Sequence, residues 1–152
     1  MQLFILRHAE AQTHATSDFT RNLTELGRRQ LAQVIGRHNA QLDSISQVWV
    51  SPYVRTQQTL QQIESLLPTS ARIETTEDLT PESPVELIIP LLERSVGDRV
   101  LLISHQPLVG EAVARLCGLA PGYYRLGTSA FTHIDLPLLA FGQGQVILCD
   151  QP

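Results

Sequence analysis

Two short apolar runs that each end at a histidine constrain this chain most. Leu3-Phe4-Ile5-Leu6 runs directly into Arg7-His8, and Val100-Leu101-Leu102-Ile103-Ser104 runs into His105. An apolar run of four or five residues that stops at polar residues is typical of a buried strand. The pattern predicts two strands that each deliver a histidine to one edge of a sheet, with an arginine beside the first.

Similar runs along the chain predict further strands, and helical patterns separate the earlier ones. The predicted strands are 2–6, 47–51, 71–75, 99–104, 130–136 and 144–149. The predicted helices are 24–39 with Thr24 as N-cap, 51–67 opened by Ser51-Pro52, 83–94 opened by Ser83-Pro84 and kinked at Pro90, and 107–118 opened by Pro107.

This alternation of strands and helices predicts an α/β fold: a three-layer sandwich with a mainly parallel central sheet flanked by helices. No helix separates the last two strands, so we expect one antiparallel strand. A length of 152 residues predicts a single domain over residues 1–152.

Charge and hydropathy exclude several partners and locations. The net charge of −4 offers no basic surface for nucleic acid, and the apolar runs are too short to cross a membrane. The first residues do not resemble a signal peptide, and Cys117 and Cys149 have neither metal nor redox spacing. We expect a cytoplasmic protein with reduced cysteines, and no membrane or nucleic-acid partner.

All 11 basic residues are arginines. Without lysine, the chain can use neither Schiff-base chemistry nor a P-loop lysine. An anion site must therefore be built from arginine, histidine and backbone N–H groups.

Such a site is predicted where the parallel strands end. Arg7 and His8 follow the first strand, Arg55 lies in the first turn of the helix after the second, and His105 follows the strand that ends at Ser104. In open α/β sheets, ligands bind beyond the carboxyl ends of the strands. Arginine forks and helix N-termini both favour phosphate, whereas two guanidiniums repel a metal cation. We expect a phosphoryl site with no metal and no cofactor.

The same environment would prepare His8 for nucleophilic attack. Neighbouring arginines disfavour the charged imidazole and lower its pKa. A neutral ring keeps a free lone pair, which a nucleophile needs. Arg7, Arg55 and His105 could then stabilise the transferred phosphoryl group.

Four segments, in order along the chain, resemble the signatures of the histidine phosphatase superfamily, the phosphoglycerate-mutase-like fold. They are Leu3–Glu10 with Arg7-His8, Arg21-Asn22-Leu23-Thr24 followed by Gly27, Ser51–Thr59 with Arg55, and Ser104-His105-Gln106-Pro107. The short chain, together with Glu77–Pro81 and Gly127–Ala130, is similar to the small SixA-type phosphohistidine phosphatases.

The resemblance implies removal of phosphate from a phosphohistidine on a partner signalling protein, such as a phosphotransfer domain. It implies that His8 is the nucleophile and that Arg7, Arg55 and His105 hold the phosphoryl group. It also implies a further contact from Arg21.

The sequence departs from the family pattern at two points. Position 9 is alanine where glycine is usual. The general acid is not marked, and the candidates are Asp18, Glu77, Asp78 and Glu82. Because the P–N bond is labile and imidazole leaves readily once its ring is protonated, a missing acid would favour phosphohistidine over phosphomonoesters.

Two alternatives stay open at this point. One is a phosphatase for a small phosphorylated metabolite, which a deep pocket with extra basic residues would favour. A shallow, open cleft would instead favour a protein substrate. The other alternative is a phosphate-binding or phosphoprotein-binding module without turnover.

Overall fold

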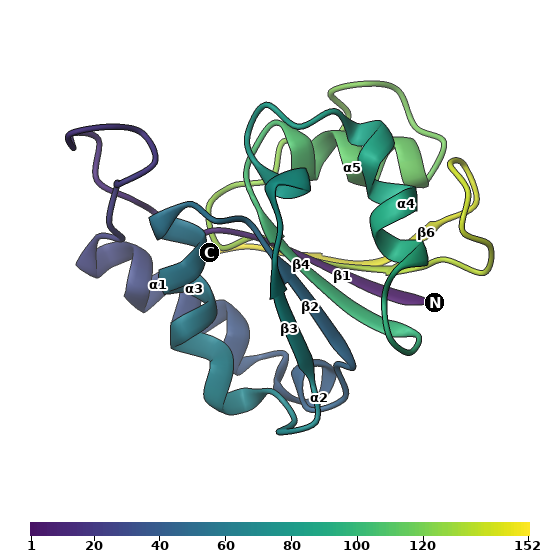
Figure 1. The fold of residues 1–152 in the computed structure, drawn as a ribbon, viewed down its shortest axis with the longest axis horizontal. Helices are drawn as coiled ribbons and strands as arrows, with labels where there is room; N and C mark the ends of the chain where they lie inside the picture. The colour runs from purple at the N-terminus through teal and green to yellow at the C-terminus, as the bar shows by residue number, and fades with distance from the viewer.

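The computed structural model describes residues 1–152 as a six-stranded sheet with helices on both faces (Figure 1). The strands are β1 (Gln2–Arg7), β2 (Gln47–Val50), β3 (Arg72–Thr75), β4 (Arg99–Ser104), β5 (Phe131–Asp135) and β6 (Gln145–Asp150). Each agrees with a predicted strand to within one residue at either end. Their order across the sheet is β3-β2-β4-β1-β5-β6.

Four neighbouring strands are parallel, and one strand runs against the rest. β3, β2, β4 and β1 pair in parallel, whereas β5 is antiparallel to both β1 and β6. The prediction of a mainly parallel sheet with one antiparallel strand is confirmed. β5 forms two antiparallel pairs, because it lies between β1 and β6.

Alternate side chains of the central strands enter two separate apolar layers. Leu3 and Ile5 of β1 pack with α4 (Ile88–Glu93) and α5 (Leu108–Leu116). Phe4 and Leu6 pack with α1 (Glu25–Gly36), α2 (Asn39–Leu42) and α3 (Val54–Ile63) on the other face. This arrangement confirms the three layers, since side chains of a strand point alternately to opposite faces. We propose that residues 1–152 form one domain around this shared sheet.

Two helix boundaries follow the predicted signals. Thr24 is the N-cap of α1, and its hydroxyl accepts a hydrogen bond of 2.9 Å from the N–H of Gly27. Pro107 precedes α5, which ends just before Gly118, whose φ of +66° suits glycine.

Two other predicted helix starts were wrong by several residues. α3 begins at Val54 with Tyr53 as N-cap, and a 3₁₀ turn (Glu64–Leu66) follows it. After Ser83-Pro84 the chain forms a 3₁₀ turn (Val85–Leu87) before α4 begins. Pro90 is the third residue of α4, where no α-helical hydrogen bond needs its missing N–H, so it does not kink a long helix.

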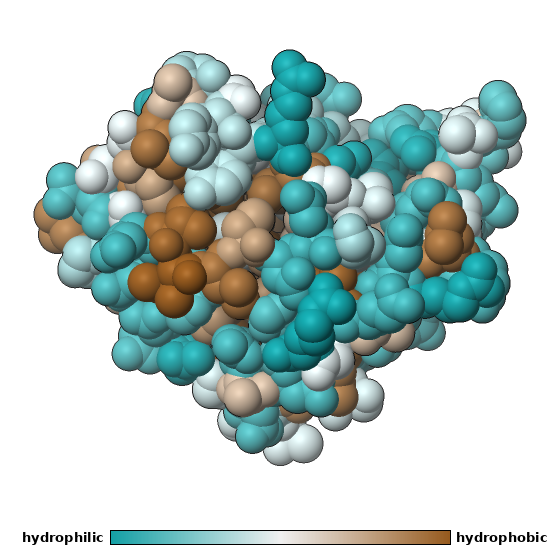
Figure 2. Space-filling model, turned by 180° about the vertical axis from the view of Figure 1, so that it is seen from behind, coloured by the Kyte–Doolittle hydropathy of each residue, from teal (hydrophilic) through white to brown (hydrophobic).

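The surface carries scattered apolar side chains. None of the helices combines the length and apolar character needed to cross a membrane. Seen from behind, the molecule is largely hydrophilic with a few hydrophobic patches (Figure 2). Leu138 and Ile147 are exposed near and within β6, and Phe19 is exposed in the loop after β1.

Candidate active site

The carboxyl ends of β1, β2 and β4 bring the predicted site residues to one edge of the sheet. Arg7 lies opposite Ser104 in the parallel register, and Val50 lies opposite Ile103. The residues that follow these strands, among them His8 and His105, therefore meet. The two histidine rings are 5.1 Å apart between centroids.

His8 is held in one orientation by hydrogen bonds at both ring nitrogens. Its Nδ1 lies 2.7 Å from the carbonyl oxygen of Ala9, and the Nε–H of Arg55 points to its Nε2 at 3.3 Å. A carbonyl only accepts, so Nδ1 carries the proton and Nε2 keeps its lone pair. This tautomer makes Nε2 the ring nitrogen with an available lone pair.

The surroundings of His8 keep its ring neutral. Burial and, to a smaller extent, the charges of Arg55, Arg7 and Arg21 together lower the pKa of His8 to about 3, although the hydrogen bond to Ala9 raises it. The residue is only 5% exposed. At neutral pH, His8 therefore presents an unprotonated nitrogen.

Alanine at position 9 is accommodated in the core. Ala9 is fully buried in the apolar layer that contains Phe4 and Leu6. Its N–H donates to the hydroxyl of Thr59, which donates to the carbonyl of Arg55. Thr59 therefore links the backbone of Ala9 to that of Arg55, and both residues contact the ring of His8.

His105 forms the opposite wall of the site. Its Nε2 is 2.7 Å from the Oγ of Ser51, and its Nδ1 is buried without a protein partner. Burial lowers its pKa to about 2, with His8 and Arg55 adding to the effect. Ser51, which was expected to cap α3, contacts this ring through its hydroxyl, and the N-cap is Tyr53.

Arg55 reaches the site from the first turn of α3 and is only 3% exposed. One Nη donates to the backbone carbonyl of Asp18 at 2.7 Å, and the other lies 3.1 Å from its carboxylate. Arg21 also donates to this carboxylate, at 2.9 Å, and its Nε donates to the carbonyl of Gln12. Asp18 thereby joins two of the predicted phosphate-binding arginines.

The structure separates the four candidate acids. The hydrogen bond from Arg21 and the contacts with Arg55 hold the pKa of Asp18 below its usual range, so this carboxylate is ionised at neutral pH. Asp78 is paired with Arg94 at 2.7 Å. Glu77 and Glu82 are exposed after β3, with no side-chain hydrogen bond to the strand-end residues. None of the four is a proton donor placed against His8.

The loop before β5 closes the third side of the site. The Nη1 of Arg7 donates to the carbonyl of Leu126 at 2.6 Å, and the N–H of Ser129 donates to the carbonyl of His8. Ser129 is fully buried and has a φ of +61°, which is uncommon for a residue other than glycine. This contact fixes the loop to the backbone of His8.

Unpaired polar atoms gather at this edge of the sheet. Arg7 Nε, His105 Nδ1 and Ser129 Oγ are buried without a partner, and only two other side-chain atoms of the chain share this condition. Buried polar groups are rarely left unpaired unless a ligand satisfies them. Together with the guanidinium of Arg55, these atoms suit the oxygens of a phosphoryl group. No group of three or more His, Cys, Asp or Glu side chains is placed to hold a metal ion.

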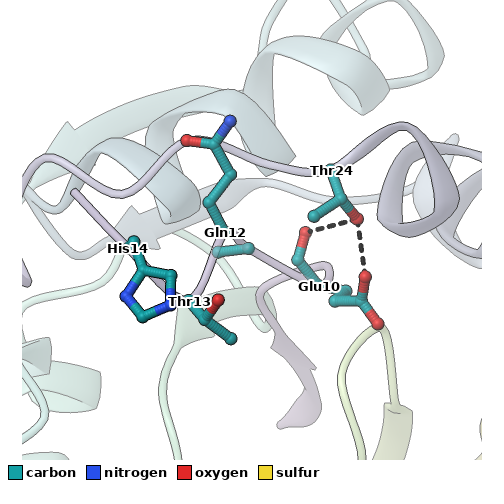
Figure 3. A pocket seen from close by; sticks show the side chains of 6 residues that line it. Glu10, Gln12, Thr13, His14 and Thr24 are labelled. Atoms are coloured by element: carbon teal, nitrogen blue, oxygen red, sulfur yellow. Dashed lines mark hydrogen bonds between the residues drawn. The ribbon is translucent and has the colours of Figure 1, made fainter.

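The largest surface hollow lies beside this site, not over it. It occupies about 650 Å³ and is lined by residues 10–14 and Thr24 (Figure 3). The hydroxyl of Thr24 donates to the carboxylate of Glu10 at 2.7 Å there. Gly27 lets the start of α1 pack against the backbone of Glu10, because a Cβ at that position would lie 2.3 Å from the Glu10 carbonyl oxygen. His8, Arg55 and His105 line none of the five main hollows.

Several contributors to the site were not predicted. Ser51 was assigned to a helix start, and Thr59 lay on a helix with no marker of function. The carbonyl of Leu126 carries no sequence signal. The unfavourable φ of Ser129 is likewise invisible in a sequence.

Comparison with known proteins gives a consistent picture. The family described as "Histidine phosphatase superfamily (branch 1)" matches residues 3–80. The phosphohistidine phosphatase SixA homolog of Haemophilus influenzae is 39% identical over 128 residues, which cover 78% of both chains. Phosphohistidine phosphatase SixA of Escherichia coli is 36% identical over 140 residues, which cover 90% of this chain and 86% of that protein.

A solved structure extends the similarity to the fold. The protein histidine phosphatase SixA complexed with tungstate superposes with a TM-score of 0.86 and 35% identity. The match covers 100% of this chain and 97% of that chain.

Proposed function

Because this chain belongs to the histidine phosphatase superfamily, we propose that it removes the phosphoryl group from phosphohistidine on a partner protein. One observation carries the proposal. The Nε2 lone pair of His8 is buried and accepts from the Nε–H of Arg55, while Arg7 Nε, His105 Nδ1 and Ser129 Oγ at the same edge of the sheet are buried without a protein partner. The relatives named phosphohistidine phosphatase support the choice of substrate.

The reaction has two steps. First, His8 Nε2 attacks phosphorus in line, and the P–N bond to the substrate imidazole breaks, with its electron pair going to the substrate nitrogen. Water then attacks the phospho-His8 intermediate, which releases phosphate and restores the neutral ring. Arg7, Arg55 and His105 stabilise the phosphoryl oxygens in both steps, and Arg21 holds the site from the first loop.

The state of the acids fits a phosphohistidine substrate. Asp18 is ionised and paired with Arg55, so it does not protonate a leaving group at neutral pH. A phosphomonoester would release an alkoxide and would need a donor. An imidazole that is already protonated at its other nitrogen leaves as a neutral molecule.

The shape of the site favours a protein over a small metabolite. The functional groups of His8, Arg55 and His105 are almost fully buried, so they contact the phosphoryl group but little beyond it. No deep pocket with additional basic residues surrounds them. We propose a substrate whose phosphohistidine protrudes from a folded surface, as in a phosphotransfer domain.

The test offers a phosphorylated phosphotransfer protein and a panel of phosphometabolites to the purified chain. Turnover of the phosphoprotein should exceed that of every metabolite in kcat/KM, and acid-labile phosphate should be trapped on the enzyme. His8→Ala should lower turnover by a factor on the order of 10³ or more. His14→Ala, which alters an exposed histidine in the adjacent loop, is the matched control.

Two outcomes would contradict the proposal. Faster turnover of a phosphometabolite would reassign the substrate. Unchanged hydrolysis by His8→Ala would exclude this residue as the nucleophile.

A further inference from the structure

An exposed aromatic side chain stands at the mouth of the phosphoryl site. Phe19 is 44% exposed, and it is the only large apolar residue between Glu10 and Asn22. Its ring packs on Tyr53, with centroids 4.9 Å apart and planes inclined by 51°. We call Phe19 and Tyr53 the aromatic lip.

Tyr53 connects the aromatic lip to the residues that hold phosphate. Its ring meets His105 edge-on at 4.9 Å between centroids. The guanidinium carbon of Arg55 lies 4.8 Å from the centre of the same ring. The Tyr53 ring of the aromatic lip therefore contacts two of the side chains that we expect to hold the phosphoryl group.

The backbone fixes the lip in place. The carbonyl of Phe19 accepts a hydrogen bond of 3.1 Å from the N–H of Val54 at the start of α3. The preceding carbonyl, of Asp18, accepts from Arg55. An exposed phenyl ring is thus anchored at the site by the same arginine that would bind substrate.

We propose that the aromatic lip receives the imidazole ring of phosphohistidine and makes the site selective for phosphoryl groups carried on an aromatic ring. This inference rests on the proposed function. In-line attack by His8 Nε2 requires the leaving nitrogen on the far side of phosphorus, and His8 itself is buried. The substrate ring must therefore lie at the mouth, where aromatic rings attract one another at centroid distances of roughly 4.5–7 Å.

The charge around the lip suits a ring that leaves. Burial raises the pKa of Tyr53, and the negative charges of Glu82 and Asp18 raise it further. Aromatic faces and carboxylates both attract a protonated imidazole. When the P–N bond breaks, its electron pair neutralises that ring, and neutral imidazole departs.

The test compares two P–N substrates that differ in the ring. Phosphoimidazole carries an imidazole leaving group, and phosphoramidate releases ammonia. Phe19→Leu keeps an apolar side chain without the ring and should lower kcat/KM for phosphoimidazole about three- to tenfold. With phosphoramidate, its kcat/KM should stay within about twofold of the unaltered enzyme.

A further variant, outside the site, serves as the control. Tyr123→Leu removes an exposed aromatic ring from the loop after α5 and should change neither substrate's turnover.

Each result supports the aromatic lip or overturns it. If Phe19→Leu turns over phosphoimidazole like the unaltered enzyme, or slows both substrates equally, the lip does not recognise the ring. If the unaltered enzyme does not use phosphoramidate, the two variants are compared on phosphoimidazole alone. A lower kcat/KM for Phe19→Leu than for Tyr123→Leu then supports the aromatic lip, and equal values overturn it. Failure of the unaltered enzyme on every phosphohistidine compound would refute the proposed function itself.

Discussion

Mild acid should destabilise the folded chain through His8 and His105. Burial lowers the pKa of His8 to about 3 and of His105 to about 2. In the unfolded chain, both rings titrate near pH 6.5. As the pH falls below that value, the unfolded chain binds protons that the folded site refuses, so stability is lost between roughly pH 6.5 and the folded pKa values.

The expected loss can be worked out for each ring. Between pH 7.5 and pH 5.5 a histidine that stays neutral when folded and titrates near 6.5 when unfolded loses about 1.4 kcal/mol of stability. The two rings together give about 2.7 kcal/mol, a large part of the roughly 5–15 kcal/mol that stabilises a typical domain.

The assay is urea denaturation at the two pH values. The change in the free energy of unfolding is compared between the unaltered chain and a variant with His8→Asn and His105→Gln. Both new side chains are neutral throughout, and their amides replace the ring nitrogens that contact Ala9 and Ser51. Burial also lowers the pKa of His133. Because both proteins contain His133, its contribution to the pH dependence of stability cancels in the comparison.

The variant should lose about 2.7 kcal/mol less than the unaltered chain over this interval. Equal losses in the two proteins would refute the reasoning, because they would mean that the two rings are protonated in the folded state as readily as in the unfolded chain.

Three further predictions follow from individual contacts. Asp18→Asn should lower kcat/KM for phosphohistidine by less than about tenfold, because an ionised Asp18 is not the general acid; a loss on the order of 10²–10⁴ in steady-state kinetics would contradict this. Ser129→Gly should be more stable than Ser129→Ala by about 1 kcal/mol in urea titrations, since only glycine adopts a positive φ without strain; equal stabilities would mean that the backbone there is relaxed. Thr24→Ala should lower the free energy of unfolding by about 1 kcal/mol through loss of the N-cap, whereas Thr16→Ala, in the exposed first loop, should leave it unchanged.

The strands and the residues that follow them could be predicted because short apolar runs mark their own ends. Arg7, His8 and His105 come directly after such runs, and parallel pairing brings these positions to one edge. Arg55 followed from its place one turn into the next helix. The positions of these residues could be predicted from the order of the strands and helices alone, and the hydrophobic periodicity gave that order.

The remainder of the site depends on contacts that periodicity does not encode. Ser51-Pro52 resembles a helix start, yet the hydroxyl of Ser51 contacts His105, 54 residues away in sequence. The carbonyl of Leu126 acts on Arg7 through its backbone, which every residue type shares. The state of Asp18 was undecided because its partners, Arg21 and Arg55, come from different elements.

The pairing of Asp18 with Arg55 has a consequence for the end of the catalytic cycle. The Asp18 carboxylate accepts a hydrogen bond from one Nη of Arg55. The Asp18 carboxylate lies 3.1 Å from the Arg55 guanidinium. An inorganic phosphate dianion that remains after hydrolysis must share this guanidinium with that negative charge, and the repulsion between the two anions weakens phosphate binding. The site therefore favours product release, and the enzyme should resist inhibition by the free phosphate that surrounds it.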